Sequence, residues 1–530
     1  MVSTRVILEG PIRFLREKVK VNNFSSGKIS LSFVMKLFFS IIFIFSFSLT
    51  NAQNRNSIWC FGDSAGIDFR NPSAPIPFNS GMDGRGSCAS ISDSSGNLLF
   101  YTETYVSLAK TIVWNSMHDT MYNGADSIIG DGLYNELQII PFPGNNHLFY
   151  LFHTGAHTYF DGIYYSLIDM GLDQGRGAVV LKSVTINNNR IADCIQVVKH
   201  ANGRDWWIIS KLSSSPFTSY NRFIVYLISP SGISQEINYD FNDAKDIDFQ
   251  KIIINPEGSK IMSLRLNGFM CEYDFDRCSG VINNPQVIYP EITTPSLNRL
   301  FWEGSYSPDG NLFYVSTSRW TGVDQSYLIQ YDLSVNPVSA SADTLDSSLA
   351  PVGPGAIRLA PDGKIYYSRA YESPGHNSFP YADTMYNYIN MNLSVINNPD
   401  QPGAACDFQP FSFYLGGKRT YYGLPSNPDY QLGPVIGSAC DSLLNSVDDR
   451  IVEEIRIEVF PNPFLKTITF QSISQIDGML KVYNKLGNIV FSKQVSGNQS
   501  LDLAFLPSGN YVIEIIGSEN VFRKRIVKLD

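Results

Sequence analysis

Short runs of apolar and aromatic residues alternate with turns rich in Gly, Asn, Asp and Pro along most of the chain. The segment SYSPDGNLFYVS, residues 305–316, shows this pattern most clearly. Pro308 favours the first corner of a turn, Asp309 hydrogen-bonds the local backbone, and Gly310 accepts the left-handed conformation. The aromatic and β-branched residues that follow favour a strand. This segment therefore predicts a β-hairpin.

Similar hairpins are predicted along the chain, in residues 90–102, 139–154, 197–210, 252–264 and 357–369. The turn glycines Gly96, Gly144, Gly203, Gly258, Gly310 and Gly363 are separated by 48, 59, 55, 52 and 53 residues. A period near 50 residues in an all-β chain predicts a β-propeller, with one four-stranded blade per repeat. We expect six to seven blades and favour seven. The seventh would combine residues 57–69 with residues 411–425 and close the ring.

The pattern changes after residue 432. Residues 433–455 are predicted to be a linker, because part of this segment is rich in Gly, Ser and Asn. Residues 456–530 contain short alternating strands, which predict a small Ig-like β-sandwich. The predicted domains are therefore a β-propeller at 53–432 and a sandwich at 456–530.

The N-terminal region carries an export signal. Met35 and Lys36 precede an apolar run that ends near Ala52, which is the pattern of a cleavable signal peptide at 35–52. The uncharged run is short for a membrane span, so we expect no transmembrane anchor after cleavage. Residues 1–34 are interpreted as a spurious extension, because a signal peptide begins at its own Met.

The net charge and the cysteine content bear on which ligands and which covalent links the protein could have. The net charge is −9 for the whole chain and −14 without residues 1–52. Such an acidic chain argues against nucleic-acid binding. Disulfides are expected in an exported protein, and Cys271–Cys278 is the leading candidate pair, with Cys60–Cys88 and Cys406–Cys440 as weaker ones. The cysteine and histidine spacings fit no zinc site, so no metal is expected.

The residues that could take part in chemistry are better explained as structural residues. His153 and His157 have a metal-binding spacing but lie in a predicted strand and loop. The acidic residues of 242–249 do not follow the calcium-binding loop pattern. Trp206 and Trp207 suit sugar stacking, but blade packing is the better interpretation. We therefore expect no catalytic residues and no cofactor.

Two parts of the sequence resemble known families. The turns at 307–316 and 360–368 resemble the WD40-like repeats of TolB-type propellers. Residues 456–530 closely resemble the type A C-terminal sorting domain of the type IX secretion (Por) system of Bacteroidota. The matching positions, in chain order, are Phe460, Pro461, Asn462, Pro463, Tyr483, Gly487, Gly509, Tyr511, Lys524, Arg525 and Lys528.

The resemblance implies a route and a partner. The signal peptide would lead to export across the inner membrane, and the type IX translocon would recognise the sorting domain at the outer membrane. The protein would then be secreted or displayed on the cell surface. We expect the propeller to bind an extracellular glycan or protein. The alternatives are a propeller hydrolase or lyase acting on polysaccharide or peptide, and a structural or adhesion component of the envelope.

Overall fold

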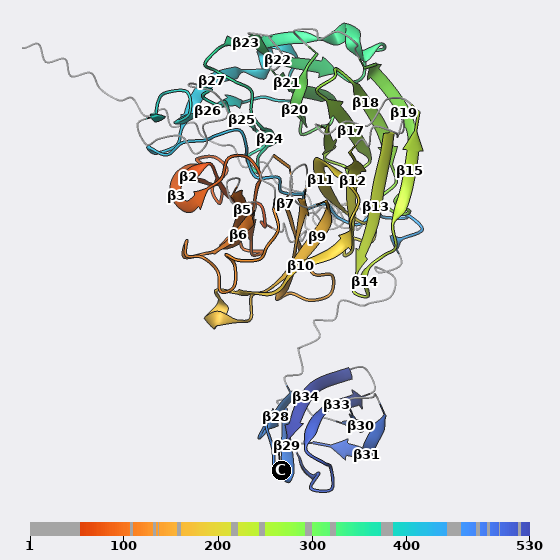
Figure 1. Ribbon diagram of the computed structural model, residues 1–530. Helices are drawn as coiled ribbons and strands as arrows, with labels where there is room; N and C mark the ends of the chain where they lie inside the picture. Colours follow the sequence, from red (N-terminus) through yellow and green to blue (C-terminus); the bar gives the residue numbers. More distant parts are fainter. Residues whose placement is uncertain are drawn as a thin grey trace, which may run out of the picture. The chain divides into compact units, whose positions relative to one another are not determined.

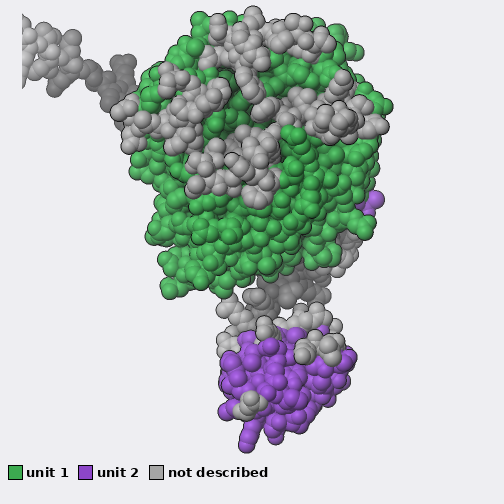
Figure 2. Space-filling view, viewed as in Figure 1, with its two compact units in different colours: residues 1–438 green, residues 439–530 purple. Residues whose placement is uncertain are grey.

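The computed structural model describes residues 54–529, except 106–109, 131–133, 136, 156–160, 214–220, 243–249, 292–298, 319–324, 373–384, 442–456, 473–476, 485–487, 498 and 518–520. The predicted signal peptide and the extension before it lie outside these residues. The chain forms two compact units, residues 1–438 and 439–530, which Figure 2 colours separately. Both units are built from strands, with three short 3-10 helices in the described part of the first unit, η2 (Asp173–Gly175), η3 (Val338–Ser341) and η5 (Gly403–Cys406).

In the described part of the first unit, the strands form seven antiparallel sheets. The first sheet contains β1 (Ile58–Phe61), β2 (Asp63–Asp68) and β3 (Ile76–Asp83). The second contains β4 (Cys88–Ser92), β5 (Leu98–Tyr105) and β6 (Lys110–Asn115). The third contains β7 (Leu137–Pro141), β8 (Leu148–Gly155), β9 (Gly162–Asp169) and β10 (Ala178–Asn187). The fourth contains β11 (Ile191–Lys199), β12 (Trp206–Leu212), β13 (Asn221–Ser229), β14 (Gly232–Ile233) and β15 (Ile237–Phe241).

The remaining three sheets of this unit have four strands each. The fifth is β16 (Gln250–Ile254), β17 (Lys260–Arg265), β18 (Met270–Phe275) and β19 (Ile282–Tyr289). The sixth is β20 (Phe301–Tyr306), β21 (Leu312–Thr317), β22 (Gln325–Asp332) and β23 (Asp343–Leu349). The seventh is β24 (Ile357–Leu359), β25 (Ile365–Tyr367), β26 (Asn392–Ile396) and β27 (Phe408–Tyr414).

The predicted hairpin turns are confirmed. All six marker glycines have positive φ between 71° and 89°, and each lies between the first and second strands of its sheet. At the turn after β20, Asp309 Oδ1 accepts hydrogen bonds from Ser307 Oγ (2.6 Å) and from the Asn311 amide (3.0 Å). These local bonds fix the turn, as expected of an Asp in this position.

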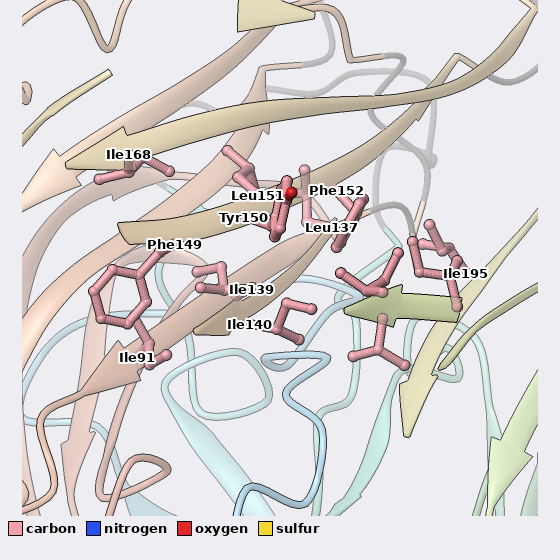
Figure 3. Packing of buried hydrophobic residues seen from close by; sticks show 14 of the residues in the cluster. Ile91, Leu137, Ile139, Ile140, Phe149, Tyr150, Leu151, Phe152, Ile168 and Ile195 are labelled. Carbon is pink, nitrogen blue, oxygen red and sulfur yellow. The ribbon is translucent and has the colours of Figure 1, made fainter. Parts of the chain in front are cut away.

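The sheets surround a common centre as in a β-propeller (Figure 1). From β4 to β24, the first strands of neighbouring sheets contact one another, so they form the inner wall of the ring. The core lies between sheets. Around β7 and β8, for example, Ile139, Phe149 and Leu151 pack with apolar residues of the adjacent sheets (Figure 3).

The ring closes differently from the expectation. The N-terminal strands β1–β3 form a sheet of their own, while residues 408–414 form β27 of the last sheet. The expected mixed blade is therefore wrong. Closure comes instead from side-chain packing, in which Trp59 and Phe69 contact Tyr366 edge to face at 6.0 and 5.5 Å. An isolated bridge between Asp63 and Arg419 adds a backbone contact.

In the second unit, the described residues form two antiparallel sheets. One has the order β28 (Ile457–Phe460), β29 (Thr467–Ser472), β32 (Gln499–Asp502). The other has the order β31 (Ile489–Ser496), β30 (Asp477–Tyr483), β33 (Gly509–Gly517), β34 (Val521–Lys528). A single apolar cluster joins them and includes Ile468, Phe470, Leu480, Val482 and Ile513. This arrangement agrees with the predicted β domain.

Candidate functional site

The inner wall of the propeller carries a buried polar network. The Lys251 ammonium lies 2.9 Å from the Asp193 carboxylate, and the Arg358 guanidinium lies 3.3 Å from the Glu303 carboxylate. Asn135 joins the second pair, because its Nδ2 donates to Glu303 (3.0 Å) while its Oδ1 accepts from Arg358 (2.7 Å). Its backbone amide donates to Asp193 at 3.0 Å. Three of these residues lie in the first strands β11, β16 and β20, Arg358 lies in β24, and Asn135 just precedes β7.

This network keeps the Glu303 carboxylate ionised. Burial alone would raise the pKa of Glu303, but the charges of Arg358 and Lys251 and the hydrogen bond from Asn135 hold that pKa below its ordinary value. A carboxylate held in this way is a poor proton donor. The ion pairs therefore act mainly as compensated buried charges, which join neighbouring sheets across the centre.

Aromatic side chains lie beside the ion pairs. Tyr134, Trp302 and Tyr422 contact one another with ring centroids 4.9 to 5.9 Å apart. Lys251 lies 5.3 Å from the Tyr134 ring, and Arg85 lies 5.3 Å from the Tyr422 ring. Rings and charges from several sheets therefore meet in this part of the ring.

Residues 420–438, which we call the channel strap, run along the inner strands. The Ser426 amide donates to Cys88 O in β4 (3.0 Å), and the Tyr430 hydroxyl donates to Ile139 O in β7 (2.8 Å). Further along, the Val435 amide donates to Ala201 O just after β11 (2.8 Å). The strap passes so close to the second sheet that a Cβ on Gly423 would lie 1.7 Å from Gly86 O. Only Gly fits at this position.

A cavity of about 350 Å³ remains beside the strap. Its walls are residues 196–198 of β11, 253–254 of β16, 303–306 of β20 and 357–359 of β24, together with strap residues 427–432. Pro256, Pro308 and Pro361 of the hairpin turns also line it, and its ionisable lining residues are Glu303, Arg358 and Asp429. The hairpin that first indicated the repeat therefore borders the cavity.

Lys199 and Asp429 are among the groups at the strap whose pKa values are shifted. Burial lowers the pKa of Lys199 to about 8, although the nearby Asp429 opposes this shift. The Lys199 ammonium donates to Tyr430 O at 2.9 Å and lies 5.2 Å from the Trp206 ring. Asp429 lines the cavity, and burial by the surrounding walls raises its pKa even though solvent reaches its side chain.

Several residues considered for chemistry prove to be packing residues. His153 is buried, its Nε2 lies 3.1 Å from Ser166 Oγ, and burial lowers its pKa to about 3. His157 and residues 243–249 lie outside the described residues. Trp206 and Trp207 are both buried; Trp206 packs on Tyr430, and Trp207 Nε1 donates to Arg277 O at 2.7 Å. Within the described ranges, no group of three or more His, Cys, Asp or Glu is arranged to hold a metal ion.

The predicted disulfides are wrong. Cys271 is a buried thiol in β18, whereas Cys278 is disulfide-bonded, as is Cys440. Cys60, Cys88 and Cys406 are also buried thiols, which excludes the two weaker pairs. Cys271 faces the core of the fourth and fifth sheets, and its proximity in sequence to Cys278 therefore did not predict the pairing.

In the second unit, the first predicted motif lies against the last strand. Asn462 Oδ1 accepts a hydrogen bond from the Val527 amide (2.8 Å). The Phe464 amide donates to Val527 O, and the Leu529 amide donates to Phe464 O, both at 2.8 Å. Lys528 Nζ lies 6.0 Å from the Phe464 ring. The segment that contains Pro461 and Pro463 is thus joined to β34, while the Phe460 side chain is exposed.

The other motif residues occupy the larger sheet. The Tyr511 hydroxyl donates to Pro507 O at 2.8 Å, and the Tyr483 hydroxyl donates to Glu514 Oε1 at 2.7 Å. Gly509 pairs with Lys528 across β33 and β34, where the backbone of Arg525 pairs with Val512. Lys524 is exposed, and Gly487 lies outside the described residues. Five of the eleven motif residues therefore lie on β33 and β34, and Asn462 bonds to β34.

The C-terminal motifs agree with a known family. Residues 458–529 match the family of secretion system C-terminal sorting domains. We refer to the second unit as the sorting domain. No relative was found among curated proteins. In the described part of the chain, no helix is long and apolar enough to cross a membrane.

Several solved structures, two of them described as propellers, are similar to part of this chain at low identity. The Dos1 propeller has a TM-score of 0.35 and 12% identity, covering 60% of this chain and 67% of its own. The Cps50 (Swd1) propeller of Myceliophteria thermophila has a TM-score of 0.35 and 10% identity, covering 59% and 94%. The periplasmic gluconolactonase PpgL of Pseudomonas aeruginosa has a TM-score of 0.34 and 10% identity, covering 74% and 94%. At these identities the likeness concerns the fold alone.

The sequence interpretation missed the inner-wall ion pairs, although a signal for them exists. Asp193 and Lys251 are 58 residues apart, and Glu303 and Arg358 are 55 residues apart. These separations are close to one repeat of the hairpin pattern. Charged residues that recur with the repeat period, each at or a few residues before the start of a predicted hairpin, would have indicated side chains that meet at the centre of the ring.

Proposed function

We propose that this protein is a propeller exported to the cell surface or the medium through the type IX secretion system. The match of residues 458–529 to secretion system sorting domains carries this proposal. The contacts of Asn462, Phe464 and Tyr511 support it, because they join the segments that define the motif into one folded unit. The partner in this step is the type IX translocon.

The route is tested in a bacterium that has this secretion system. The full chain is compared with a variant that ends at residue 438, and both are followed in the periplasm, on the cell surface and in the medium. We expect the truncated protein to accumulate in the periplasm. A control variant, Asn97→Ala in a propeller turn, should reach the surface normally. Surface display of the truncated protein would contradict the proposal.

We further propose that the propeller is a binding module for an extracellular glycan or protein. The cavity beside the channel strap supports this role, since it combines apolar walls with a few polar groups on rigid strands. Its volume of about 350 Å³ falls within the usual range for small-ligand sites. The paired state of Glu303 and Arg358 favours binding over proton transfer.

The binding role is tested with the secreted full-length protein on glycan and extracellular-protein arrays. Ser305→Trp fills the cavity from its β20 wall, whereas Ser95→Trp changes an exposed turn and serves as the matched control. We expect a ligand whose binding is lost only in Ser305→Trp. Equal binding by both variants would exclude this cavity as the binding site.

A further inference from the structure

A second cavity lies on the side of the propeller, between the third and fourth sheets. It has a volume of about 450 Å³ and is lined by Tyr150 of β8, Tyr165 of β9, residues 184–187 of β10, Tyr226 of β13 and residues 232–236. We call it the tyrosine groove. None of its lining residues belongs to the channel strap or to the inner strands, so it is separate from the cavity at the centre.

A carboxylate is held in place in this groove. Glu236 Oε2 accepts a short hydrogen bond from the Tyr226 hydroxyl and longer ones from Asn187 Nδ2 (3.4 Å) and Asn189 Nδ2 (3.3 Å). Glu236 Oε1 accepts from Asn238 Nδ2 at 3.0 Å. All four donors are neutral, so they orient the carboxylate without cancelling its charge.

A nearby acid in β15, the strand that begins directly after Glu236, has a different environment. Asp240 forms a two-bond ion pair with Arg222, with distances of 2.5 and 2.7 Å. In the described part of the chain, no Lys, Arg or His lies within ion-pair distance of Glu236. A half-buried carboxylate without a counter-charge attracts a cation from outside.

Tyr165 adds to this attraction. Its ring is partly exposed and meets Tyr150 edge to face, with centroids 5.3 Å apart, whereas Tyr150 is buried and stacks on Phe142 and Phe152. Aromatic ring faces carry partial negative charge and bind ammonium and guanidinium groups. Burial and the contact with Glu236 raise the pKa of Tyr226, so its hydroxyl stays protonated and continues to donate to the carboxylate. The groove thus offers a cation the Glu236 carboxylate and the partly exposed ring of Tyr165.

We propose that the tyrosine groove binds an organic cation, an alkylammonium or guanidinium group such as those of lysine and arginine side chains. The apolar atoms of Val184, Ile186 and Ile233 suit the aliphatic stem of such a group. A single carboxylate offers too few oxygens for calcium. A neutral sugar would leave the charge of Glu236 uncompensated.

The test uses the full-length protein, with Nα-acetyl-arginine amide and choline as cationic probes and glucose as the neutral control. Affinities are measured by calorimetry or by ligand-observed NMR. Glu236→Gln removes the charge while keeping the shape, and Glu257→Gln removes one exposed charge elsewhere. We expect Glu236→Gln to weaken binding of a cationic probe about tenfold or more. Glu257→Gln should leave binding unchanged.

A second variant tests the proposal even if Glu236→Gln disturbs folding. Thr185→Lys places a cation from this chain at the exposed border of the groove, and we expect it to abolish probe binding by competition. Binding to the wild-type protein should also weaken as salt is added. Equal affinities for the Glu236→Gln and Glu257→Gln proteins, tighter binding of glucose than of either cation, or no binding of either cation would overturn the proposal. Comparison of the two probes identifies the preferred cation. These binding measurements test the groove independently of the proposed secretion route.

Discussion

The propeller and the sorting domain differ in how many charged side chains they bury. In the propeller, ionisable groups are buried throughout the described core, among them Glu103, Asp193, Lys199, Lys211, Lys251, Arg265, Glu303, Arg369 and Arg419. In the described part of the sorting domain, the buried charged residues are Glu514 and Lys528, both on strands of the larger sheet. The core of this domain is otherwise apolar.

Geometry explains the difference. The first strands of the propeller sheets surround a shared centre, so side chains from several sheets must meet there. Polar side chains in this position need partners, because a buried unpaired charge is very unfavourable. A two-sheet domain buries one face of each sheet and can direct most charges to solvent. Contacts between residues distant in sequence hold both units together, but in the propeller they include buried ion pairs, whereas in the sorting domain they are backbone hydrogen bonds and apolar packing.

The largest expected effect comes from breaking an inner-wall ion pair. Arg358→Met leaves the Glu303 carboxylate buried without its main counter-charge, and we expect it to lower the free energy of unfolding by about 3–5 kcal/mol. Chemical denaturation measures this change. Hydrogen exchange in the sorting domain should not change, which would show that the effect is confined to the propeller.

The double variant Glu303→Gln/Arg358→Met is the matched control. It removes both charges and should recover much of the lost stability. If the double variant is as unstable as Arg358→Met, packing and not charge compensation accounts for the loss.

A second prediction concerns Glu103, which is buried in β5 and accepts hydrogen bonds from Trp114 Nε1 (3.0 Å) and the Asp83 amide (2.8 Å). Burial raises its pKa from 4.5 to about 8. Between these values the folded state keeps a proton that the unfolded state loses, so stability falls as pH rises through this range. Glu103→Gln has no proton to lose. We expect the variant to gain about 2–4 kcal/mol over wild type between pH 5 and pH 9.

Thermal unfolding at several pH values measures this difference. Glu257→Gln, at an exposed turn, keeps Glu103, and its stability should fall with rising pH as that of the wild type does. A constant difference between wild type and Glu103→Gln would mean that Glu103 is ionised in the folded protein.

A smaller effect is expected in the sorting domain. Asn462→Ala removes the acceptor of the Val527 amide and should cost about 1 kcal/mol. The change should appear as faster hydrogen exchange at β34 in the full-length protein. Asn488→Ala, on the exposed loop before β31, is the control. Slower or unchanged exchange at Val527 would show that Asn462 does not hold the last strand.

The smallest effect on stability is expected at the turn after β20, which borders the cavity beside the channel strap. Asp309→Ala removes the acceptor of Ser307 Oγ and the Asn311 amide, and we expect a loss of about 1 kcal/mol or less. Faster exchange at Asn311 should accompany it, and Asp309→Asn should restore much of the protection. A large global loss would mean that this turn contributes more than a local hairpin.

Much of the fold could be predicted from the sequence, because the residues that specify each turn and motif lie within a few positions of one another. The six hairpin turns were predicted from Gly, Asn and Asp at fixed places, and each glycine has the expected positive φ. The sorting motif was recognisable for the same reason, since Tyr511 bonds to Pro507 only four residues away. The predicted domain limits, by contrast, stay predictions, because much of the segment between the two units lies outside the described residues.

The errors concern contacts that are distant in the chain. The Cys271–Cys278 pair was chosen for its proximity in sequence, but the side chain of Cys271 points into the core. The first and last sheets close the ring through Trp59 and Tyr366, although the sequence pattern suggested a shared blade. Neither outcome follows from turn signals or strand propensities.

The sequence by itself determined the strand-and-turn repeat and the identity of the sorting domain, because turn preferences and short motifs act over a few residues. Only the tertiary structure decided which charges meet at the centre of the ring and which remain uncompensated. Asp193 finds Lys251 one repeat away, while Glu236 is surrounded by neutral donors. The physical reason is that pairing depends on which side chains the sheets bring within a few ångströms, and that follows from how the blades pack.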